Sequence, residues 1–401
     1  MSASNPARQP LHGVRVLDLS RVLAGPYCAQ LLADQGADVI KVEGPAGDEN
    51  RLWGARAANG VTCNFNSVNR GKRSIMLDLK ADAAQEVLRG LMKRADIVIH
   101  SFLPDTGARL GVDYERAKAL REEVIFCSIS GYGEKGPMRN SAGYDLMMQA
   151  FSGIMSTTGY EGGPPVRVGA SCIDLATGFV AYGGIMTALL NRARGAGGDW
   201  VRVSLLETAI SLLGYHAVAW LQAGLLPTRE GSGVLHLVPY QAFQCRDGYL
   251  LAGATNDAAW RRFAEALGRG ELADDERFRT NEKRLEHREL LVEILETEFQ
   301  AHSVGHWVRR FEPKGVAVAP MHTLDQVLTH PQVLANDLIV ETVDADGART
   351  RVLGAPFKLL HSDGLDTRAA PLLGADTEQI LRDELGYDAA TIERLREGRA
   401  I

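Results

Sequence analysis

Short runs of branched apolar residues alternate with longer amphipathic stretches from residue 14 to about residue 130. The runs at 14–19, 37–42 and 97–99 have the length and the Val and Ile content of buried strands. Between them, the stretches 25–35 and 83–94 have the composition and spacing of helices. Strands and helices in alternation indicate a parallel sheet covered by helices. We therefore predict a large, doubly wound α/β domain.

Further elements of the same kind extend this prediction. Strands are expected at 74–79, 124–130 and 200–205, and helices at 113–121, 146–155 and 207–223. Asp145 stands at the start of one of these helices, where an Asp commonly caps the first turn, so we expect it to cap that helix.

The alternation ends near residue 225, after which the pattern is that of a second, smaller α+β domain. A hairpin is expected over 242–253, turning at Asp247-Gly248, and helices at 257–267, 284–301 and 304–311. Short helices at 324–328 and 331–335, a hairpin over 340–352 and two charged terminal helices follow.

Composition narrows the class of protein. The 401 residues are 45% hydrophobic and 23% charged, which is ordinary for a globular protein, and the net charge of −6 gives no support to nucleic-acid or membrane-surface binding. The five cysteines form no CxxC pair, which favours a reduced, cytoplasmic protein over a disulfide framework or a metal site. The first ten residues are expected to be a disordered tail without the apolar core of a signal peptide. No uninterrupted apolar run reaches the roughly 20 residues of a membrane span.

One acidic residue opens an almost uncharged stretch, GASCIDLATGFVAYGGIMTALLN, that runs from Gly169 to Asn191 and predicts a buried helix. Asp174 at its start has two interpretations. It can be the helix N-cap, since Asp is preferred there. It can also be a nucleophile, kept ionised by the helix N-terminus.

Two features bear on ligand binding. The turn after the first strand, Arg21 to Gly25, has no GxGxxG, which argues against a dinucleotide site. The basic cluster Asn69–Arg73 is either a solvated face or, because it lies beside predicted strand ends, a site for an anionic ligand such as a phosphorylated nucleotide. Arg109 is a second candidate phosphate contact, with a surface ion pair as the alternative.

Several motifs coincide in this chain. They are VLDLSRVLAGPYCAQLLADQGADVIKVE, NRGKRSIMLDLK, GARLGVDY, SISGYGEKGP, AGYDLMMQAFSG, DLATG at Asp174, GAPFKL and APLLGADT. With them the chain resembles, over nearly its whole length, the family III CoA-transferases, a group that also includes the α-methylacyl-CoA racemases.

The resemblance implies covalent catalysis by Asp174 on acyl-CoA and carboxylic acid substrates, through an aspartyl anhydride and an aspartyl-CoA thioester, without a metal or a tightly bound cofactor. It further implies a glycine-bearing loop that supplies backbone donors, here Gly231–Tyr240, although only two glycines stand in it. The positions that contact CoA in the family fall on Val22, Leu23, Ala24, Leu77, Lys80, Ser101, Phe102, Arg109, Ala142 and Tyr144.

Substrate choice follows less directly. Leu23 replaces a Gln of the oxalate-handling members, which argues against formyl or oxalyl groups. The run VPYQAF with DGYLLAGATND resembles the succinyl-CoA:glutarate and related dicarboxylate transferases. A dicarboxylate acceptor requires a cation for its distal end. The candidates are Arg21, Arg51, Arg56 and Arg167.

Two alternatives remain beside a transferase. A racemase of this family would need a histidine at position 144, where this chain has Tyr144, a poor base at neutral pH. A non-catalytic protein that binds CoA or a dinucleotide is the other alternative, and turnover would exclude it.

Fold and assembly are also implied by the resemblance: a Rossmann-like large domain built from both ends of the chain, and an interlocked homodimer. The expected division is 1–200 as the N-terminal part of the large CoA-binding domain, 201–226 as a linker helix, 227–320 as the small domain, and 321–401 as a linker and return to the large domain.

Overall fold

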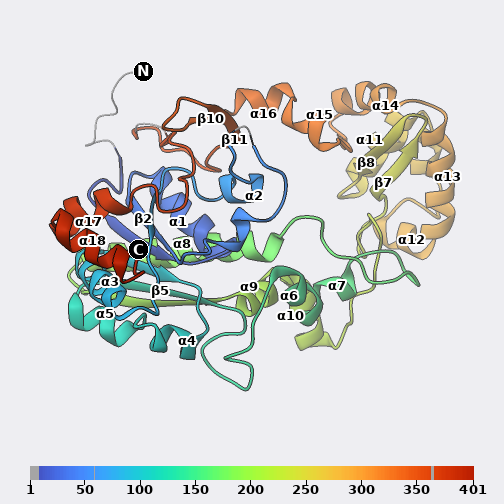
Figure 1. Ribbon diagram of the computed structural model, residues 1–401. Coiled ribbons are helices and arrows are strands. Elements are labelled where there is room, and N and C mark those ends of the chain that lie inside the picture. The colour runs from blue at the N-terminus through green and yellow to red at the C-terminus, as the bar shows by residue number, and fades with distance from the viewer. Residues whose placement is uncertain (1–8, 58, 363–364) are drawn as a thin grey trace. The chain divides into compact units, whose positions relative to one another are not determined.

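The computed structural model describes residues 9–57, 59–362 and 365–401, so most of the expected N-terminal tail lies outside the described residues. The chain forms two compact units (Figure 1). The large unit takes the chain up to Ile154, then 168–218 and 331–401, and the small unit takes 155–167 and 219–330.

The large unit is built on one six-stranded sheet in which every neighbouring pair is parallel. Its strands are β1 (Arg15–Leu19), β2 (Asp38–Glu43), β3 (Arg73–Met76), β4 (Ile97–His100), β5 (Ile125–Ser130) and β6 (Asp199–Ser204). Their order is β3-β2-β1-β4-β5-β6, which is the order of dinucleotide-binding sheets. The strand order reverses between β1 and β4, and this place is called the switch point of the sheet. The parallel α/β sheet predicted from the alternating pattern is confirmed.

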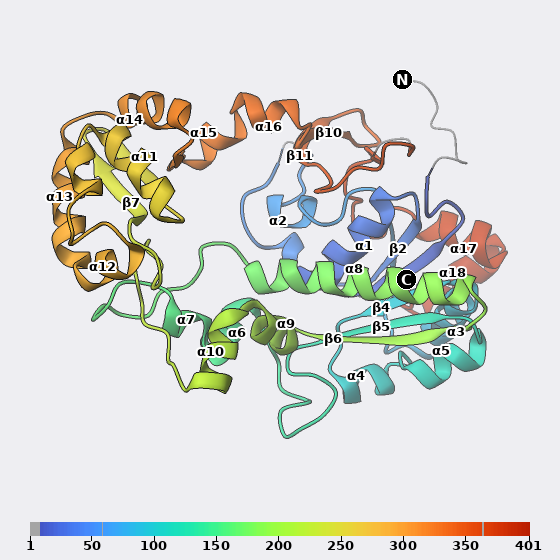
Figure 2. The ribbon, with the colours of Figure 1, turned by 180° about the vertical axis from the view of Figure 1, so that it is seen from behind.

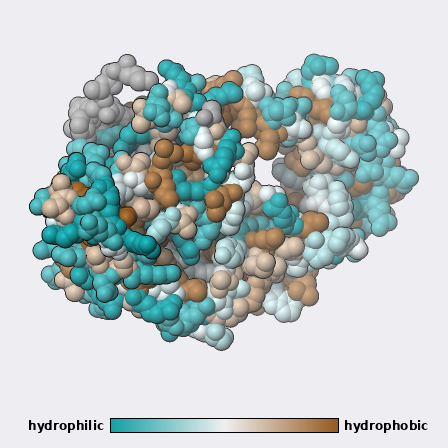
Figure 3. Space-filling view, viewed as in Figure 1, coloured by the Kyte–Doolittle hydropathy of each residue, from teal (hydrophilic) through white to brown (hydrophobic). Residues whose placement is uncertain are grey.

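Helices cover both faces of this sheet because successive strand residues point to opposite sides. Ile97 and Ile99 of β4 pack with α1 (Ala24–Asp34) and α8 (Cys172–Ala193). Val98 packs on the other side with α3, α5, α17 and α18. On the face drawn in Figure 3, hydrophilic side chains predominate over α5, α17 and α18, as expected for outer helices. The other helices of the large unit are α3 (Asp82–Arg94), α5 (Tyr114–Leu120), α17 (Thr377–Leu385), α18 (Ala389–Glu397), α2 (Cys63–Asn66), α4 (Pro104–Arg109), α6 (Asp145–Phe151), α9 (Leu205–Leu212) and α16 (Pro331–Ala335). The chain passes from one unit to the other within α7 (Ile154–Thr157) and within α10 (Tyr215–Ala223).

By length and composition alone, α8 is the one helix of the described residues that is apolar enough to cross a membrane. It runs along the sheet in Figure 2 and packs against α1, α9, β5 and β6. Ile173, Ala181 and Ile185 of α8 are fully buried in the core of the large unit, whereas Phe179, Val180 and Leu190 are 41–51% exposed. The helix predicted to be buried is therefore only partly buried within the described residues.

The C-terminal part of the chain covers an edge of the sheet. After the antiparallel hairpin of β10 (Ile339–Val343) and β11 (Arg349–Leu353), the chain reaches β3, which has a sheet neighbour on one side only. Ser74 N donates to the carboxylate of Asp376 (2.8 Å), and Met76 N donates to the hydroxyl of Thr377 (3.0 Å). Unpaired edge groups are thereby satisfied within the chain.

The small unit has a three-stranded antiparallel sheet, β7-β8-β9, with helices packed on it. Its elements are β7 (Tyr240–Cys245), β8 (Gly248–Gly253), β9 (Ala317–Pro320), α11 (Asp257–Leu267), α12 (Asn281–Glu286), α13 (Arg288–Gln300), α14 (Val304–Phe311) and α15 (Leu324–Leu328). Cys245 pairs with Gly248, so the hairpin turns one residue earlier than predicted, at Arg246-Asp247. Tyr160 bridges Glu230 within this unit. The domain ranges expected from the sequence stay a prediction.

Three predicted helices are each divided in two. Gly153 (φ +95°) separates α6 from α7, and Gly214 (φ +49°) separates α9 from α10. These left-handed backbone angles suit glycine and interrupt a right-handed helix. The third division lies at His287, between α12 and α13.

Residues 69–72 of the basic cluster are buried in the large unit, and Arg73 is partly buried and paired with Asp38. Both interpretations of the cluster, a ligand site and a solvated face, are therefore wrong. Lys72 Nζ lies 2.9 Å from the carboxylate of Asp18 with both side chains fully buried. Arg70 is buried in a two-pronged pair with Asp34. The cluster therefore holds the fold together through ion pairs to acidic residues distant in the sequence.

Candidate active site

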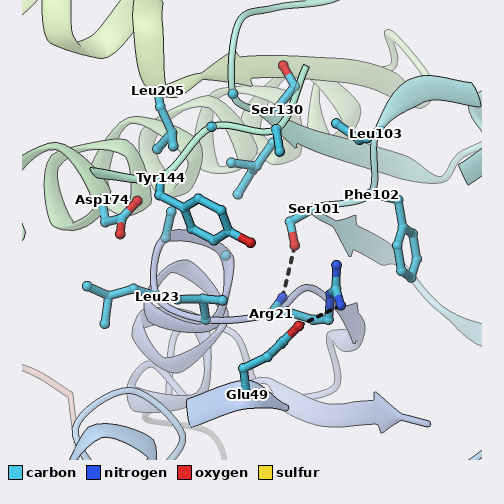
Figure 4. A pocket seen from close by; sticks show the side chains of 17 residues that line it. Arg21, Leu23, Glu49, Ser101, Phe102, Leu103, Ser130, Tyr144, Asp174 and Leu205 are labelled. Atoms are coloured by element: carbon cyan, nitrogen blue, oxygen red, sulfur yellow. Dashed lines mark hydrogen bonds and ion pairs between the residues drawn. The ribbon is translucent and has the colours of Figure 1, made fainter. Parts of the chain in front are cut away.

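A cavity in the large unit opens at the carboxyl ends of β1, β4 and β5 (Figure 4). It lies at the switch point between β1 and β4, where the strand order reverses. Open α/β sheets bind ligands at this place. The cavity is lined by Arg21, Val22, Leu23, Ala24, Gly25, Glu49, Ser101, Phe102, Leu103, Ile129, Ser130, Gly131, Ala142, Gly143, Tyr144, Asp174 and Leu205.

Close backbone approaches bring distant segments to the cavity. A Cβ on Gly178 would lie 2.8 Å from the carbonyl oxygen of Ala24, so glycine lets α8 approach the first turn of α1. A Cβ on Gly131 would lie 2.8 Å from Gly143 N, so glycine also closes the loop after β5 upon itself. These contacts place Tyr144 and Asp174 on the same cavity as the residues after β1.

Asp174 is the third residue of α8 and is not its N-cap, so the N-cap interpretation is wrong. The N-cap is Ser171, which makes no side-chain cap bond. Instead Asp145 Oδ1 accepts hydrogen bonds from the backbone N of Ile173 (2.8 Å) and of Asp174 (3.2 Å). Asp145 therefore caps α8, and the prediction that it caps its own helix α6 is also wrong, because the N-cap of α6 is Tyr144.

The Asp174 carboxylate faces the cavity (Figure 4). Within the described residues no donor bonds to its oxygens. Burial, and next the nearby charge of Asp145, raise its pKa from 3.8 to about 7. The helix N-terminus was expected to keep this group ionised, but the amides of Ile173 and Asp174 donate to Asp145 instead, and the raised pKa favours the protonated form below about pH 7. A carboxylate without hydrogen-bond donors is a stronger nucleophile when it does ionise.

The pH dependence of any reaction that uses the Asp174 carboxylate follows from this pKa. Activity is expected to rise with pH through an apparent pKa near 7 and to level off above it, since the ionised form reacts. Replacing Asp145 by Asn (Asp145→Asn) removes the neighbouring charge and should move this rise to lower pH by roughly one unit. Profiles of kcat/KM measure the shift, with the exposed Asp82→Asn as control, and an unmoved profile would contradict the coupling.

Most of the residues predicted to contact CoA line this cavity together with Asp174. They are Val22, Leu23, Ala24, Ser101, Phe102, Ala142 and Tyr144. Leu77, Lys80 and Arg109 are not among its lining residues. The side chain of Leu77 is fully buried in the core. Lys80 and Arg109 are exposed, and Arg109 donates to the hydroxyl of Thr106.

Among the four arginine candidates for a distal carboxylate, Arg21 lines the cavity. Its guanidinium pairs with Glu49 at 2.8 Å, and its backbone N donates to Ser101 Oγ. Arg51 is held by Glu43, and Arg56 donates to the carbonyl of Gly60. Arg167 belongs to the small unit.

Sequence reasoning missed several lining residues. Ser130 ends the strand predicted at 124–130, and Gly131 follows it. Their position at the carboxyl end of a parallel strand could have identified them, because ligands bind at such ends. Glu49 gave no such signal, because its place beside Arg21 depends on the fold. Among the described residues no three His, Cys, Asp or Glu side chains converge as metal ligands.

Comparison with known proteins identifies the family of the chain. The model of "CoA-transferase family III" matches residues 11–377. This chain belongs to CoA-transferase family III. Acyl-CoA is the substrate that this family uses, and the protein is therefore a CoA-transferase enzyme.

Individual relatives of this family III CoA-transferase agree over nearly the whole chain. Succinyl-CoA:glutarate CoA-transferase of Mus musculus is 39% identical, over 96% of this chain and 89% of the relative. Succinyl-CoA–D-citramalate CoA-transferase of Chloroflexus aurantiacus is 32% identical over the full length of both chains. A CAIB/BAIF family protein from Brucella suis has a crystal structure similar to this family III fold, with a TM-score of 0.85 and 34% identity over 94% of this chain and all of that one.

Proposed function

We propose that this enzyme moves CoA from succinyl-CoA to a short dicarboxylate such as glutarate, with Asp174 as the nucleophile. The observation that carries the proposal is the Asp174 carboxylate, which lines a cavity at the switch point of the sheet with no donor bonded to its oxygens among the described residues. Relatives named as transferases between succinyl-CoA and glutarate or D-citramalate support the choice of substrates.

The proposed steps conserve the energy of the thioester. The Asp174 carboxylate attacks the thioester carbonyl carbon, the C–S bond breaks, and CoA leaves as thiolate from a mixed anhydride. The thiolate then attacks the aspartyl carbon, which forms an aspartyl-CoA thioester and releases the donor as carboxylate. The acceptor carboxylate attacks the aspartyl carbon of that thioester, which releases CoA thiolate and forms a second mixed anhydride. The thiolate then attacks the acceptor acyl carbon, which yields the new acyl-CoA and free Asp174.

CoA is proposed to lie along the cavity wall formed by Val22–Ala24, Ser101 and Phe102, with Lys80 and Arg109 as phosphate contacts outside the lining. We also propose that two copies of the chain pair, as the resemblance implies. In support, α10 buries none of its residues, and Trp220 and Leu221 on it are 52% and 79% exposed. Sedimentation of the purified protein as a monomer would contradict the pairing.

A panel of acceptors tests the proposed transfer. The enzyme is incubated with succinyl-CoA and glutarate, other dicarboxylates of increasing length, or monocarboxylates of matched length, and new acyl-CoAs are measured by mass spectrometry. The proposal predicts glutaryl-CoA or another dicarboxyl-CoA as the best product. Equal turnover of matched monocarboxylates would contradict the proposal that the acceptor is a dicarboxylate. Exchange of the α-proton without acyl transfer would indicate a racemase. Within the described chain no histidine lines the cavity, so the racemase alternative lacks its second proton-transfer group.

Arg21 is proposed to bind the distal carboxylate of the acceptor. Substituting Arg21→Gln should raise KM for the dicarboxylate by roughly tenfold, since a charge-assisted bond is lost, and should leave KM for a monocarboxylate almost unchanged. Steady-state kinetics with both acceptors measure this difference. Arg56→Gln is the control, because Arg56 does not line the cavity. A parallel loss for both acceptors would assign Arg21 to CoA instead.

A further inference from the structure

Val22 has a backbone conformation that is unfavourable for its side chain. Its φ is +67°, in the left-handed region, and such an angle is an outlier for a β-branched residue. Val22 also lines the cavity that contains Asp174. Strained residues at a functional site persist only where the surrounding structure holds them, so the contacts of this residue show what imposes the angle.

The peptide groups on either side of Val22 are held by two buried side chains. Val22 N donates to both carboxylate oxygens of Asp48, at 3.1 and 3.2 Å. The carbonyl oxygen of Val22 accepts a hydrogen bond from the side-chain amide of Asn50. Asp48 and Asn50 are only 1% and 2% exposed, so neither bond competes with bulk water.

The two holding residues are themselves fixed. Asp48 Oδ1 also accepts from the backbone N of Asn50 (3.0 Å), which ties the Asp48 side chain to the backbone of Asn50. Lys41 Nζ lies 2.9 Å from Asp48, and both side chains are fully buried. The same Lys41 donates to the carbonyl oxygen of Ser20 (3.0 Å). One buried lysine therefore contacts both Asp48 and the loop after β1, residues 20–23.

Neighbouring backbone groups of the loop are anchored in the same way. Ser20 N donates to Asp18 (3.0 Å), and Arg21 N donates to Ser101 Oγ (2.9 Å). The loop leads directly into α1, whose N-cap, Leu23, makes no side-chain cap bond. The first turn of α1, at Ala24 and Gly25, lies on the cavity. Its backbone amides have no side-chain cap of their own.

We infer that Asp48 and Asn50 are positioning residues of this enzyme: they clamp Val22 in the left-handed conformation so that residues 21–24 and the first turn of α1 face the acyl-CoA site. The inference rests on the proposed function, because it takes the cavity as that site. Without the clamp, Val22 relaxes to an extended conformation that valine prefers. The wall of the cavity then loses its shape while the buried core remains.

A double-mutant cycle tests the clamp. Glycine adopts positive φ without a Cβ penalty, so a Val22→Gly substitution removes the need for the clamp. Asn50→Ala is expected to lower kcat/KM for the acyl-CoA about tenfold in the wild-type background, the factor that corresponds to the left-handed cost of one residue. In the Val22→Gly background the same substitution is expected to lower it less than about threefold.

The controls separate positioning from general destabilisation. Asn66→Ala removes another buried asparagine, which bonds to Asn59 and not to the loop, and its effect should be the same in both backgrounds. Equal losses from Asn50→Ala in both backgrounds would overturn the inference. So would a crystal structure of the Asn50→Ala variant in which φ of Val22 stays near +67°. The crystal structure tests the clamp independently of activity. If the enzyme turned over no acceptor, the proposed function would be refuted, but the role of Asp48 and Asn50 in holding Val22 would still be tested.

Discussion

The Asp174→Asn variant is expected to lose CoA transfer by at least about 10⁴-fold, the scale on which loss of a covalent nucleophile is felt. An amide cannot attack a thioester or carry CoA as an aspartyl thioester. Wild-type enzyme quenched during turnover should show the mass of CoA on the peptide that contains residue 174, and the variant should show none. The exposed Asp383→Asn is the control and should retain turnover.

The same variant is also expected to be more stable than the wild type at pH 8. The pKa of Asp174 is about 7 in the folded protein and 3.8 in the unfolded chain. The free energy of unfolding therefore decreases as the pH rises from about 4 to about 7. At pH 8 the ionised group costs roughly 2 kcal/mol, a figure reduced because the carboxylate faces an open cavity. Denaturant unfolding at pH 8 and pH 4 measures it. A stability gain that persists at pH 4, or a destabilised variant at pH 8, would contradict the raised pKa.

Lys72→Met is expected to lower the free energy of unfolding by about 3–5 kcal/mol, because it leaves a buried charge without its partner. Lys72 Nζ bonds to the carboxylate of Asp18, to the carbonyl of Pro26 and to Asn69 Oδ1, at 2.8–2.9 Å. Burial opposes the charge of Asp18, and Lys72 and Lys41 nevertheless hold its pKa below the usual value. Urea unfolding at neutral pH measures the loss.

Two further variants make this test specific. Lys93→Met changes an exposed lysine on α3 and is expected to alter stability by less than about 0.5 kcal/mol. The double variant Lys72→Met/Asp18→Asn removes the stranded charge and should recover part of the loss. A Lys72→Met protein as stable as Lys93→Met would mean that the pair contributes little to the fold.

The sheet was predictable because its information is local. The strands β1, β2, β4 and β5 are each a short run of branched apolar residues between turn residues, and local pattern suffices to find them. Helix breaks at Gly153 and Gly214 were missed, since a single glycine inside a helical pattern is tolerated as often as it interrupts.

The candidate site was predictable in part for a different reason. Motif resemblance pointed to Asp174 and to seven cavity-lining positions, although composition and spacing alone did not separate a nucleophile from a cap. The pairing of Lys72 with Asp18, and the capping of α8 by Asp145, join residues 54 and 29 positions apart. No local pattern encodes such partners, so a basic cluster looked exposed and an N-terminal aspartate looked fully ionised.

The covered edge of β3 has a consequence for synthesis of the chain. The groups that satisfy Ser74 and Met76 come from Asp376 and Thr377, about 300 residues later. While a ribosome is still making the middle of the protein, that edge strand has no cover from its own chain. The edge of the nascent sheet therefore stays uncovered until residues 376 and 377 have been synthesised, and until then a chaperone or a neighbouring nascent chain can occupy it.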